Sequence, residues 1–273
     1  MEPIRILNEL IEDAKEKKSE LWIVFQDMSK CYDRVNIYML EKAMLRLKLP
    51  PNFIEIIKNL FSNRKNRVFT AHGLTDPYDV LIGIDQGEVI SPLLWCIYYD
   101  PLLVEVQSRQ LGYNLSHTYR QNLYDPTSVT TESINIPALA YMDDTNWISD
   151  SEQNTALILT ISKEFFSFTN ILVNDFKAEL MTTAKLTMIT NSNGVLSPAP
   201  ITFTTGLSTV TLTPKLHRSS VRYLGVWINL NKSRTFVLNQ CKKEISVCCS
   251  LLRSKRVSDK QLYMCIIWLL YLA

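Results

Sequence analysis

The stretch ALAYMDDTNWIS, residues 138–149, places the adjacent aspartates Asp143 and Asp144 between two runs of strand-forming residues. This pattern predicts a strand–turn–strand with two carboxylates at its tip. The apolar run LWIVFQDM, residues 21–28, predicts a buried strand that ends at a third carboxylate, Asp27. Adjacent aspartates repel each other unless a cation neutralises them, and Mg²⁺ binds through few carboxylates plus substrate phosphates. An isolated Asp-Asp pair fits an ordinary turn equally well, because aspartate is a favoured turn residue.

Glycine is scarce, with seven residues in a chain of 273. This scarcity excludes collagen-like and glycine-rich linker sequences. Neither G-x-G-x-x-G nor G-x-x-x-x-G-K-[ST] occurs, so a Rossmann or P-loop nucleotide site has no support. The chain has no apolar run long enough for a bilayer and begins with a charged stretch unlike a signal peptide. We therefore expect a protein of the nucleus or cytoplasm that is neither secreted nor bound in a membrane.

The formal net charge of +2 hides an uneven distribution. Residues 1–184 carry 17 lysines and arginines against 25 acidic residues, whereas residues 185–273 carry 12 against two. A basic end on an acidic body favours a polyanionic partner for that end. A basic helix face that is simply solvated is the alternative.

The remaining patterns predict a mixed order of helices and strands without a repeat. Apolar residues at helical spacing predict helices over 4–18, 36–49, 52–63, 152–172, 234–253 and 258–272. Ser91-Pro92 predicts a further helix, with serine as the N-cap and proline at the first helical position. Residues 67–72 and 78–84 flank a turn and predict a hairpin, and residues 111–133 are polar and predict a loop or an insertion.

Five blocks occur in the order that is typical of reverse transcriptases, and the chain resembles that family through them. They are QDMSKCYDRV (26–35) for motif A, GIDQGEVISPLL (83–94) for B, ALAYMDDTNWIS (138–149) for C, NDFK (174–177) for D and RYLGVWI (222–228) for E. The K-x-[FY]-D and Q-G-x-x-x-S-P forms of motifs A and B resemble LINE-like non-LTR retrotransposons. Tyr141-Met142 departs from the Phe-Ala that more often precedes the two aspartates in that group.

The resemblance implies an RNA-directed DNA polymerase that transfers nucleotides from dNTPs to a primer 3′-hydroxyl with two Mg²⁺ ions, or with Mn²⁺. It implies metal binding and catalysis by Asp27, Asp143 and Asp144, and Lys177 beside the leaving pyrophosphate. It implies substrate binding by Tyr32, Gln86 and Gly87, with Tyr32 excluding a 2′-hydroxyl, and a primer grip of Tyr223, Leu224 and Gly225. A core tyrosine, a solvated lysine and a packing leucine are the alternatives for Tyr32, Lys177 and Leu224.

The fold implied by the resemblance is α+β: a right-hand polymerase palm, an antiparallel sheet flanked by helices, with partial fingers and the start of a helical thumb. We assign residues 1–20 to partial fingers, 21–230 to the palm with a finger insert, and 231–273 to the basic thumb. Its side chains Lys242, Lys243, Arg253, Lys255 and Arg256 are expected to contact phosphates. The expected partners are an RNA template, a DNA primer and dNTPs, with no membrane and no obligate protein partner.

The upstream finger motifs of the family are absent before Asp27, and the chain ends in the uncapped apolar run CIIWLLYLA. We therefore expect a chain truncated at both ends. One alternative is an inactive remnant that only binds nucleic acid. The other is an RNA-dependent RNA polymerase, whose members usually show Gly-Asp-Asp. Gln86-Gly87 with Ser91-Pro92, together with Tyr32 and Tyr141-Met142, argue against that class.

Overall fold

The computed structural model describes residues 2–122, 124–125, 127–174, 177–190, 196–205, 208–253, 258, 260–261 and 263–264. The chain divides into two compact units, Met1–Leu216 and His217–Ala273. The first unit combines helices and antiparallel strands, which confirms the predicted α+β class. None of the helices in the described part of the chain combines the length and the hydropathy that a membrane span requires.

The first unit is built on one antiparallel sheet in the order β10-β1-β9-β8, with β11 also paired to β1. The strands are β1 (Trp22–Ser29), β8 (Ala138–Tyr141), β9 (Asp144–Ser149), β10 (Leu172–Val173) and β11 (Glu179–Thr182). β9 lies along one edge of β1, while β11 and β10 follow each other along the other edge. β1 is buried along most of its length, as its apolar run predicts, but it continues two residues beyond the predicted end at Asp27.

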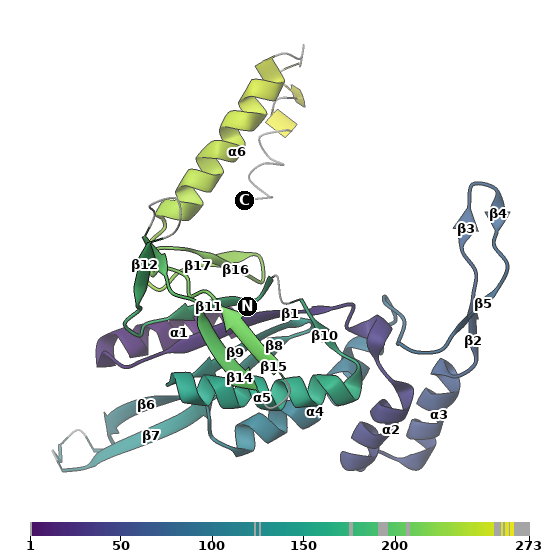
Figure 1. Ribbon diagram of the computed structural model, residues 1–273, viewed down its shortest axis with the longest axis horizontal. Coiled ribbons are helices and arrows are strands. Elements are labelled where there is room, and N and C mark those ends of the chain that lie inside the picture. The colour runs from purple at the N-terminus through teal and green to yellow at the C-terminus, as the bar shows by residue number, and fades with distance from the viewer. Residues whose placement is uncertain are drawn as a thin grey trace. The chain divides into compact units, whose positions relative to one another are not determined.

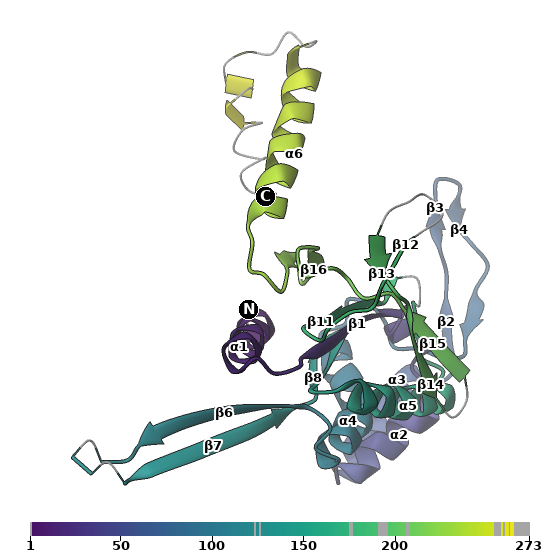
Figure 2. The same ribbon diagram turned by 60° about the vertical axis from the view of Figure 1, so that its left-hand side comes forward.

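The two faces of this sheet are covered by different helices. Side chains of a strand alternate between faces, and Trp22, Val24 and Met28 belong to the main core with helices α4 (Ser91–Ser108) and α5 (Glu152–Thr169). Ile23 and Phe25 are buried on the other face, outside that core. Helix α1 (Glu2–Lys17) lies on this side, opposite α4 and α5 (Figures 1 and 2). Asp27 therefore points to the same side of the sheet as α1.

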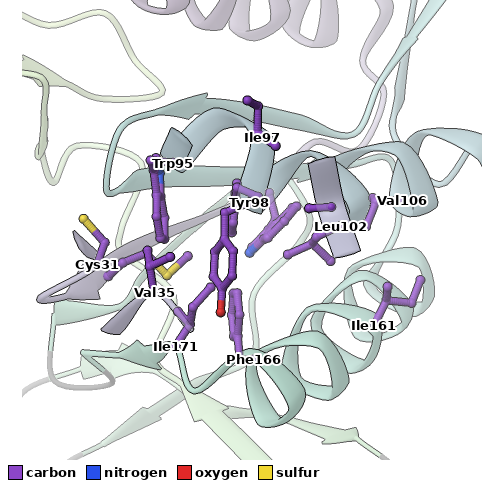
Figure 3. Packing of buried hydrophobic residues seen from close by; sticks show 14 of the residues in the cluster. Cys31, Val35, Trp95, Ile97, Tyr98, Leu102, Val106, Ile161, Phe166 and Ile171 are labelled. Atoms are coloured by element: carbon purple, nitrogen blue, oxygen red, sulfur yellow. The ribbon is translucent and has the colours of Figure 1, made fainter. Parts of the chain in front are cut away.

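Aromatic side chains fill the main core (Figure 3). The ring of Trp95 stacks on Tyr99 at 5.4 Å, and Tyr99 in turn stacks on Phe166 at 6.5 Å. Tyr98 places its hydroxyl between α5 and α2 (Ile37–Arg46), because it donates to the Thr169 carbonyl at 2.8 Å and accepts from the backbone N–H of residue 36. Helix α3 (Pro51–Phe61) packs against α2. These contacts fix α4, which is the helix beneath the site.

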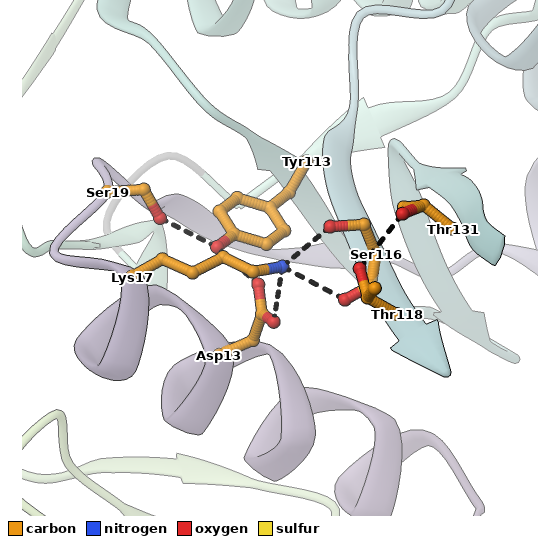
Figure 4. Close-up of polar contacts among 7 residues, drawn as sticks. All are labelled: Asp13, Lys17, Ser19, Tyr113, Ser116, Thr118 and Thr131. Carbon is orange, nitrogen blue, oxygen red and sulfur yellow. Dashed lines mark hydrogen bonds and ion pairs between the residues drawn. The ribbon is translucent and has the colours of Figure 1, made fainter. Parts of the chain in front are cut away.

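Residues 111–133, predicted to be a loop or an insertion, form most of a long hairpin. Strands β6 (Tyr113–Arg120) and β7 (Val129–Ile136) pair over eight positions and project from the sheet (Figure 1). The loop interpretation was wrong, because Ser, Thr and Asn alternate here with only a few apolar residues and hide the strands. The base of the hairpin is tied to α1, since Tyr113 bonds to Asp13 and Ser19 at 2.7 Å, and the Lys17 ammonium donates to Ser116 (Figure 4).

A second projecting hairpin leads from α3 toward the predicted substrate loop. Its strands β2 (Arg64–Asn66) and β5 (Tyr78–Val80) pair near the base, and β3 (Phe69–Thr70) and β4 (Gly73–Leu74) pair at the tip. The hairpin itself was predicted, but its pairing was not: it begins at Arg64 and turns at residues 71–72. Two further hairpins follow motif D, β12 (Met188–Thr190) with β13 (Leu196–Pro198), and β14 (Ile201–Thr205) with β15 (Ser208–Leu212).

The described residues of the second unit form a small hairpin and a long helix. Strands β16 (Val221–Tyr223) and β17 (Val226–Ile228) enclose a two-residue turn, Leu224-Gly225, in which both residues have positive φ. Positive φ at both residues is a backbone conformation that two-residue hairpin turns prefer. Helix α6 (Thr235–Arg253) follows, and none of its side chains is buried. The predicted helix over 258–272 lies mostly outside the described residues.

Candidate active site

The register of β1 and β9 brings the three predicted carboxylates together. Asp27 pairs with Asp144, and the next residue of β1, Met28, donates its backbone N–H to the Asp143 carbonyl at 3.1 Å. Directly paired residues of an antiparallel ladder lie on the same face of the sheet. Asp27 and Asp144 are therefore neighbours on the face that α1 covers, at the end of the sheet where the turn between β8 and β9 lies.

That turn contains a strained residue that is fixed by two side chains. Met142 has φ 55°, a conformation that is uncommon for residues other than glycine. The indole N–H of Trp95 donates to the Met142 carbonyl at 2.7 Å, and the Tyr32 hydroxyl donates to the Met142 sulfur at 3.3 Å. Trp95 is almost completely buried. The turn that carries Asp143 is thus anchored to the core by a residue that the sequence analysis did not single out.

Lys177 lies directly on the carboxylate of Asp27. Its Nζ is 2.8 Å from Asp27 Oδ2. The backbone supports this contact, because the N–H of Asn174 donates to the Asp27 carbonyl and the N–H of Lys177 donates to the Asn174 carbonyl, both at 2.9 Å. The residues between them, 175 and 176, lie outside the described part of the chain. Lys177, predicted at the site from motif D, is therefore next to a predicted metal ligand.

The electrostatics of the cluster are dominated by negative charge. The pKa of Asp144 is raised by burial and by the charges of Asp143 and Asp27, while Lys177 partly offsets them. The pKa of the Lys177 ammonium is raised by its hydrogen bond to Asp27 and by the same charge. The hydrogen bond and the charge of Asp27 hold the lysine protonated, so it acts as the counter-cation of the cluster.

The donor set has the chemistry that a hard divalent cation requires. It offers carboxylate oxygens only, and its mutual repulsion would be relieved by a cation. Among the described residues, no three acidic, histidine or cysteine side chains already form a closed metal cage. Lys177 occupies one carboxylate oxygen of Asp27, so the residues fit a metal in type and charge while the ligand arrangement itself is not preformed.

Tyr32 connects the motif A segment to the segment that leads into motif B. Its ring packs edge-on against Trp95 at 6.1 Å, and burial raises the pKa of its hydroxyl. The Tyr32 carbonyl accepts from the backbone N–H of Ile84 at 2.9 Å. The side chain is half-buried rather than a closed core residue. It therefore lies between the carboxylate turn and the predicted substrate loop.

Gln86 and Gly87 lie in an exposed turn whose two ends are held firmly. Arg64, with a side chain only 11% exposed, pairs with Asp85 at 2.6 Å and donates to the Gly83 carbonyl. The Ser91 hydroxyl donates to the Asp85 carbonyl at 2.6 Å. The serine was predicted to be the N-cap of α4, but that position belongs to the preceding isoleucine, and Ser91 instead fixes the loop. Sequence reasoning missed Arg64 because no motif contains it.

The two glycines of this loop are required for different reasons. A Cβ on Gly83 would lie 2.8 Å from the Asp33 carbonyl oxygen, and its φ is +89°. Gly87 has φ +96°, but nothing lies within 4 Å of a Cβ placed there. Gly87 belongs to the Q-G signature of motif B, yet Gly83 is the glycine at which the motif A and motif B segments approach most closely.

The remaining predicted residues belong to the second unit. Tyr223 is buried, and Leu224 and Gly225 form the turn described above. Lys242, Lys243 and Arg253 are exposed on α6. Lys255 and Arg256 lie outside the described residues.

The model of the family described as "Reverse transcriptase (RNA-dependent DNA polymerase)" matches residues 1–228. The chain belongs to the reverse transcriptase family. This match spans the carboxylate cluster, Lys177 and the β16–β17 hairpin, and it confirms the family that the five motifs predicted. No curated protein is similar enough in sequence to be matched with the chain.

Solved structures similar to this reverse transcriptase include fungal telomerases. Telomerase from Candida albicans, in complex with a fragment of telomeric RNA, matches 83% of this chain and 33% of its own at 14% identity, with a TM-score of 0.51. Apo telomerase from Candida tropicalis, truncated from its C-terminal domain, matches 72% of this chain and 39% of its own at 17% identity, with a TM-score of 0.43. The first likeness supports the polymerase fold alone. The chain spans less than two fifths of these proteins.

Proposed function

We propose that this chain is the palm of an RNA-directed DNA polymerase from a LINE-like non-LTR retrotransposon. The observation that carries the proposal is the register of β1 and β9, which pairs Asp27 with Asp144 beside Asp143. The proposed domains are partial fingers over residues 1–20, the palm over 21–230 and the start of the thumb over 231–273. The proposed partners are an RNA template, a DNA primer and dNTPs, in the nucleus or cytoplasm.

In this proposal Asp27, Asp143 and Asp144 would hold two Mg²⁺ ions. Bound magnesium supplies activation of the primer 3′-hydroxyl and neutralises charge on the triphosphate. Lys177 is 2.8 Å from Asp27 and protonated, so it is available to neutralise or protonate the leaving pyrophosphate once the carboxylate is engaged elsewhere.

The other residues bind and orient. Tyr32 is held against Trp95 and Met142, so its ring would form a fixed wall beneath the sugar and exclude a 2′-hydroxyl. The turn at Gln86 and Gly87, anchored through Arg64 and Ser91, would back the new base pair. The turn at Tyr223, Leu224 and Gly225 would support the primer end, and the lysines of α6 would contact phosphates without reading sequence.

Nucleotide selection tests this proposal against an RNA-dependent RNA polymerase. The purified chain should extend a DNA primer on an RNA template with Mg²⁺ and dNTPs, and should use NTPs at least tenfold less efficiently. Tyr32→Ala should relax this preference. A wild-type preference for NTPs would assign the palm to an RNA polymerase, and an unchanged preference in Tyr32→Ala would refute the role of Tyr32. Binding of the template–primer without any extension would instead indicate an inactive remnant.

A further inference from the structure

A cavity of about 330 Å³ lies behind the catalytic strand, on the face of the sheet that is opposite to Asp27. Its apolar wall consists of side chains from α5, β10, the connection between them and β15: Leu159, Phe166, Ile171, Leu172, Val173 and Val210. All of its lining belongs to the first unit. Its volume is within the range of small-molecule sites, which are about 300–1,000 Å³ and mostly apolar with a few polar groups.

Gln26 supplies the cavity with a polar side chain, of which the core uses only the amide oxygen. It lines the cavity, is 8% exposed, and occupies a face of β1 whose other side chains are Trp22, Val24 and Met28. Its Oε1 accepts a hydrogen bond from the Trp147 indole at 2.6 Å. Among the described residues, no group accepts a hydrogen bond from its amide nitrogen. This N–H₂ group is therefore available as a donor to a ligand in the cavity.

The charge of the lining selects the kind of ligand. Lys163 is the one charged side chain among the described residues that line the cavity. The hydroxyls of Ser162 and Ser167 donate to carbonyls of their own helix and are already used. The cavity thus offers an apolar interior, the cation of Lys163 and the side-chain amides of Gln26 and Asn170. We propose that it binds small amphiphilic anions, with the apolar body between α5 and β10 and the oxyanion attracted by Lys163 and the Gln26 amide.

The position of the cavity relates such a ligand to the carboxylate cluster. Val173 in its wall pairs with Met28, and the next residue, Asn174, donates to the Asp27 carbonyl and accepts from the N–H of Lys177. The wall therefore continues into the segment that holds Lys177 on Asp27. Binding itself does not depend on the proposed polymerase activity and is measured without it.

The fluorescent sulfonate 8-anilinonaphthalene-1-sulfonate is the direct probe, titrated into the full chain. We expect one saturable site, displaced by octanoate and not by octylammonium, which has the same chain length and the opposite charge. Octanoate should also shift the indole ¹H–¹⁵N resonance of Trp147, because its partner Gln26 lines the cavity. Equal displacement by the two compounds would overturn the proposal, since it would indicate apolar binding without charge selection.

Two variants and one control locate the site. Lys163→Glu should raise the octanoate concentration for half displacement at least tenfold, whereas Lys15→Glu, the same charge change on an exposed position of α1, should leave it unchanged. Val210→Trp should fill the cavity and abolish probe binding. Lys163 is half-exposed on helix α5, so the Lys163→Glu variant should fold. Its circular dichroism spectrum checks that it does. Wild-type binding by folded Lys163→Glu would refute the site, whatever Val210→Trp does.

Discussion

Three carboxylates and one ammonium group share the end of β1 and β9, and their charges act on the pKa of Asp144 and on the pKa of Lys177. Burial and the two neighbouring aspartates raise the pKa of Asp144, so ionising this carboxyl costs folding free energy. That cost is present at neutral pH and is removed when the pH falls through the raised pKa. Ionised groups that lower the stability of the folded protein in this way are typical of functional sites.

The variant Asp144→Asn tests this cost. It should raise the melting temperature by a few degrees at pH 7, because the ionised carboxyl is removed. The gain should shrink as the pH is lowered toward 4, because the wild-type carboxyl then takes up a proton. Mg²⁺ should raise the melting temperature of the wild type more than that of the variant. Thermal unfolding at several pH values measures all three effects.

The matched control is Asp76→Asn, at an exposed position of the projecting hairpin. It should leave the melting temperature and its response to Mg²⁺ unchanged. A melting temperature for Asp144→Asn below that of the wild type at pH 7 would contradict the electrostatic account.

Among the residues, sequence patterns singled out the carboxylates and the lysine that the fold brings together, but not the side chains that support them. Asp27, Asp144 and Lys177 come together in the structure, because strand register and a short connection follow from local sequence. Trp95 and Arg64 were missed. Trp95 supports the site through the Met142 carbonyl, and Arg64 supports it through the Asp85 carboxylate and the Gly83 carbonyl. A single sequence contains no signal for such contacts between distant residues.

At the scale of elements, amphipathic helices and buried strands were predicted well, whereas one long hairpin was missed and the pairing of another was not predicted. Helix α1 has strong apolar periodicity and strand β1 begins with a continuous apolar run, and both signals survive in almost any packing. Strands β6 and β7 have weak periodicity and pair mainly with each other, so their polar composition was mistaken for a loop. The predicted N-cap at Ser91 was wrong, because a contact within the preceding loop replaces the local one. The Ser91 hydroxyl donates to the Asp85 carbonyl instead of capping its own helix.

The loop between β5 and α4 provides a prediction at this scale. Arg64→Met removes the ion pair to Asp85 and the hydrogen bond to the Gly83 carbonyl, which leaves a buried acceptor unpaired. Such a change costs about 1–3 kcal/mol. We expect a lower melting temperature and a raised KM for dNTPs, because the turn at Gln86 is no longer held.

Lys65→Met is the neighbouring control, because Lys65 is well exposed and pairs loosely with Asp79 at 3.8 Å. It should change neither quantity appreciably. If Arg64→Met and Lys65→Met behaved alike in thermal unfolding and steady-state kinetics, the arginine would not anchor the loop.

At the scale of the whole molecule, the acidic first part of the chain contains the carboxylate cluster, and the basic end contains the exposed lysines of α6. This division suits an enzyme that holds phosphates through metal-bound carboxylates and basic side chains instead of glycine-rich loops. The seven glycines agree with this, because Gly83, Gly87 and Gly225 take positive φ in turns beside the predicted site motifs.

Salt dependence tests the role of the basic end. The double variant Lys242→Gln, Lys243→Gln should weaken template–primer binding about equally for all sequences. The plot of log K against log salt has a negative slope. For each phosphate that is no longer neutralised by a lysine, the magnitude of this slope should fall by about 0.7–0.9. Fluorescence anisotropy over a salt series measures the slope. The same two changes at Lys15 and Lys18 of the α1 end should leave it as in the wild type, and an unchanged slope in the α6 variant would exclude phosphate binding by these lysines.

The central claim is that Asp27, Asp143 and Asp144 form a polymerase centre, and primer extension tests it most directly. The purified chain is given Mg²⁺, dNTPs and a DNA primer on an RNA template, beside Asp143→Ala and the exposed control Asp76→Ala. The account predicts template-dependent extension by the wild type and by Asp76→Ala, and a loss of at least a thousandfold in Asp143→Ala. Equal incorporation by the wild type and Asp143→Ala would contradict it.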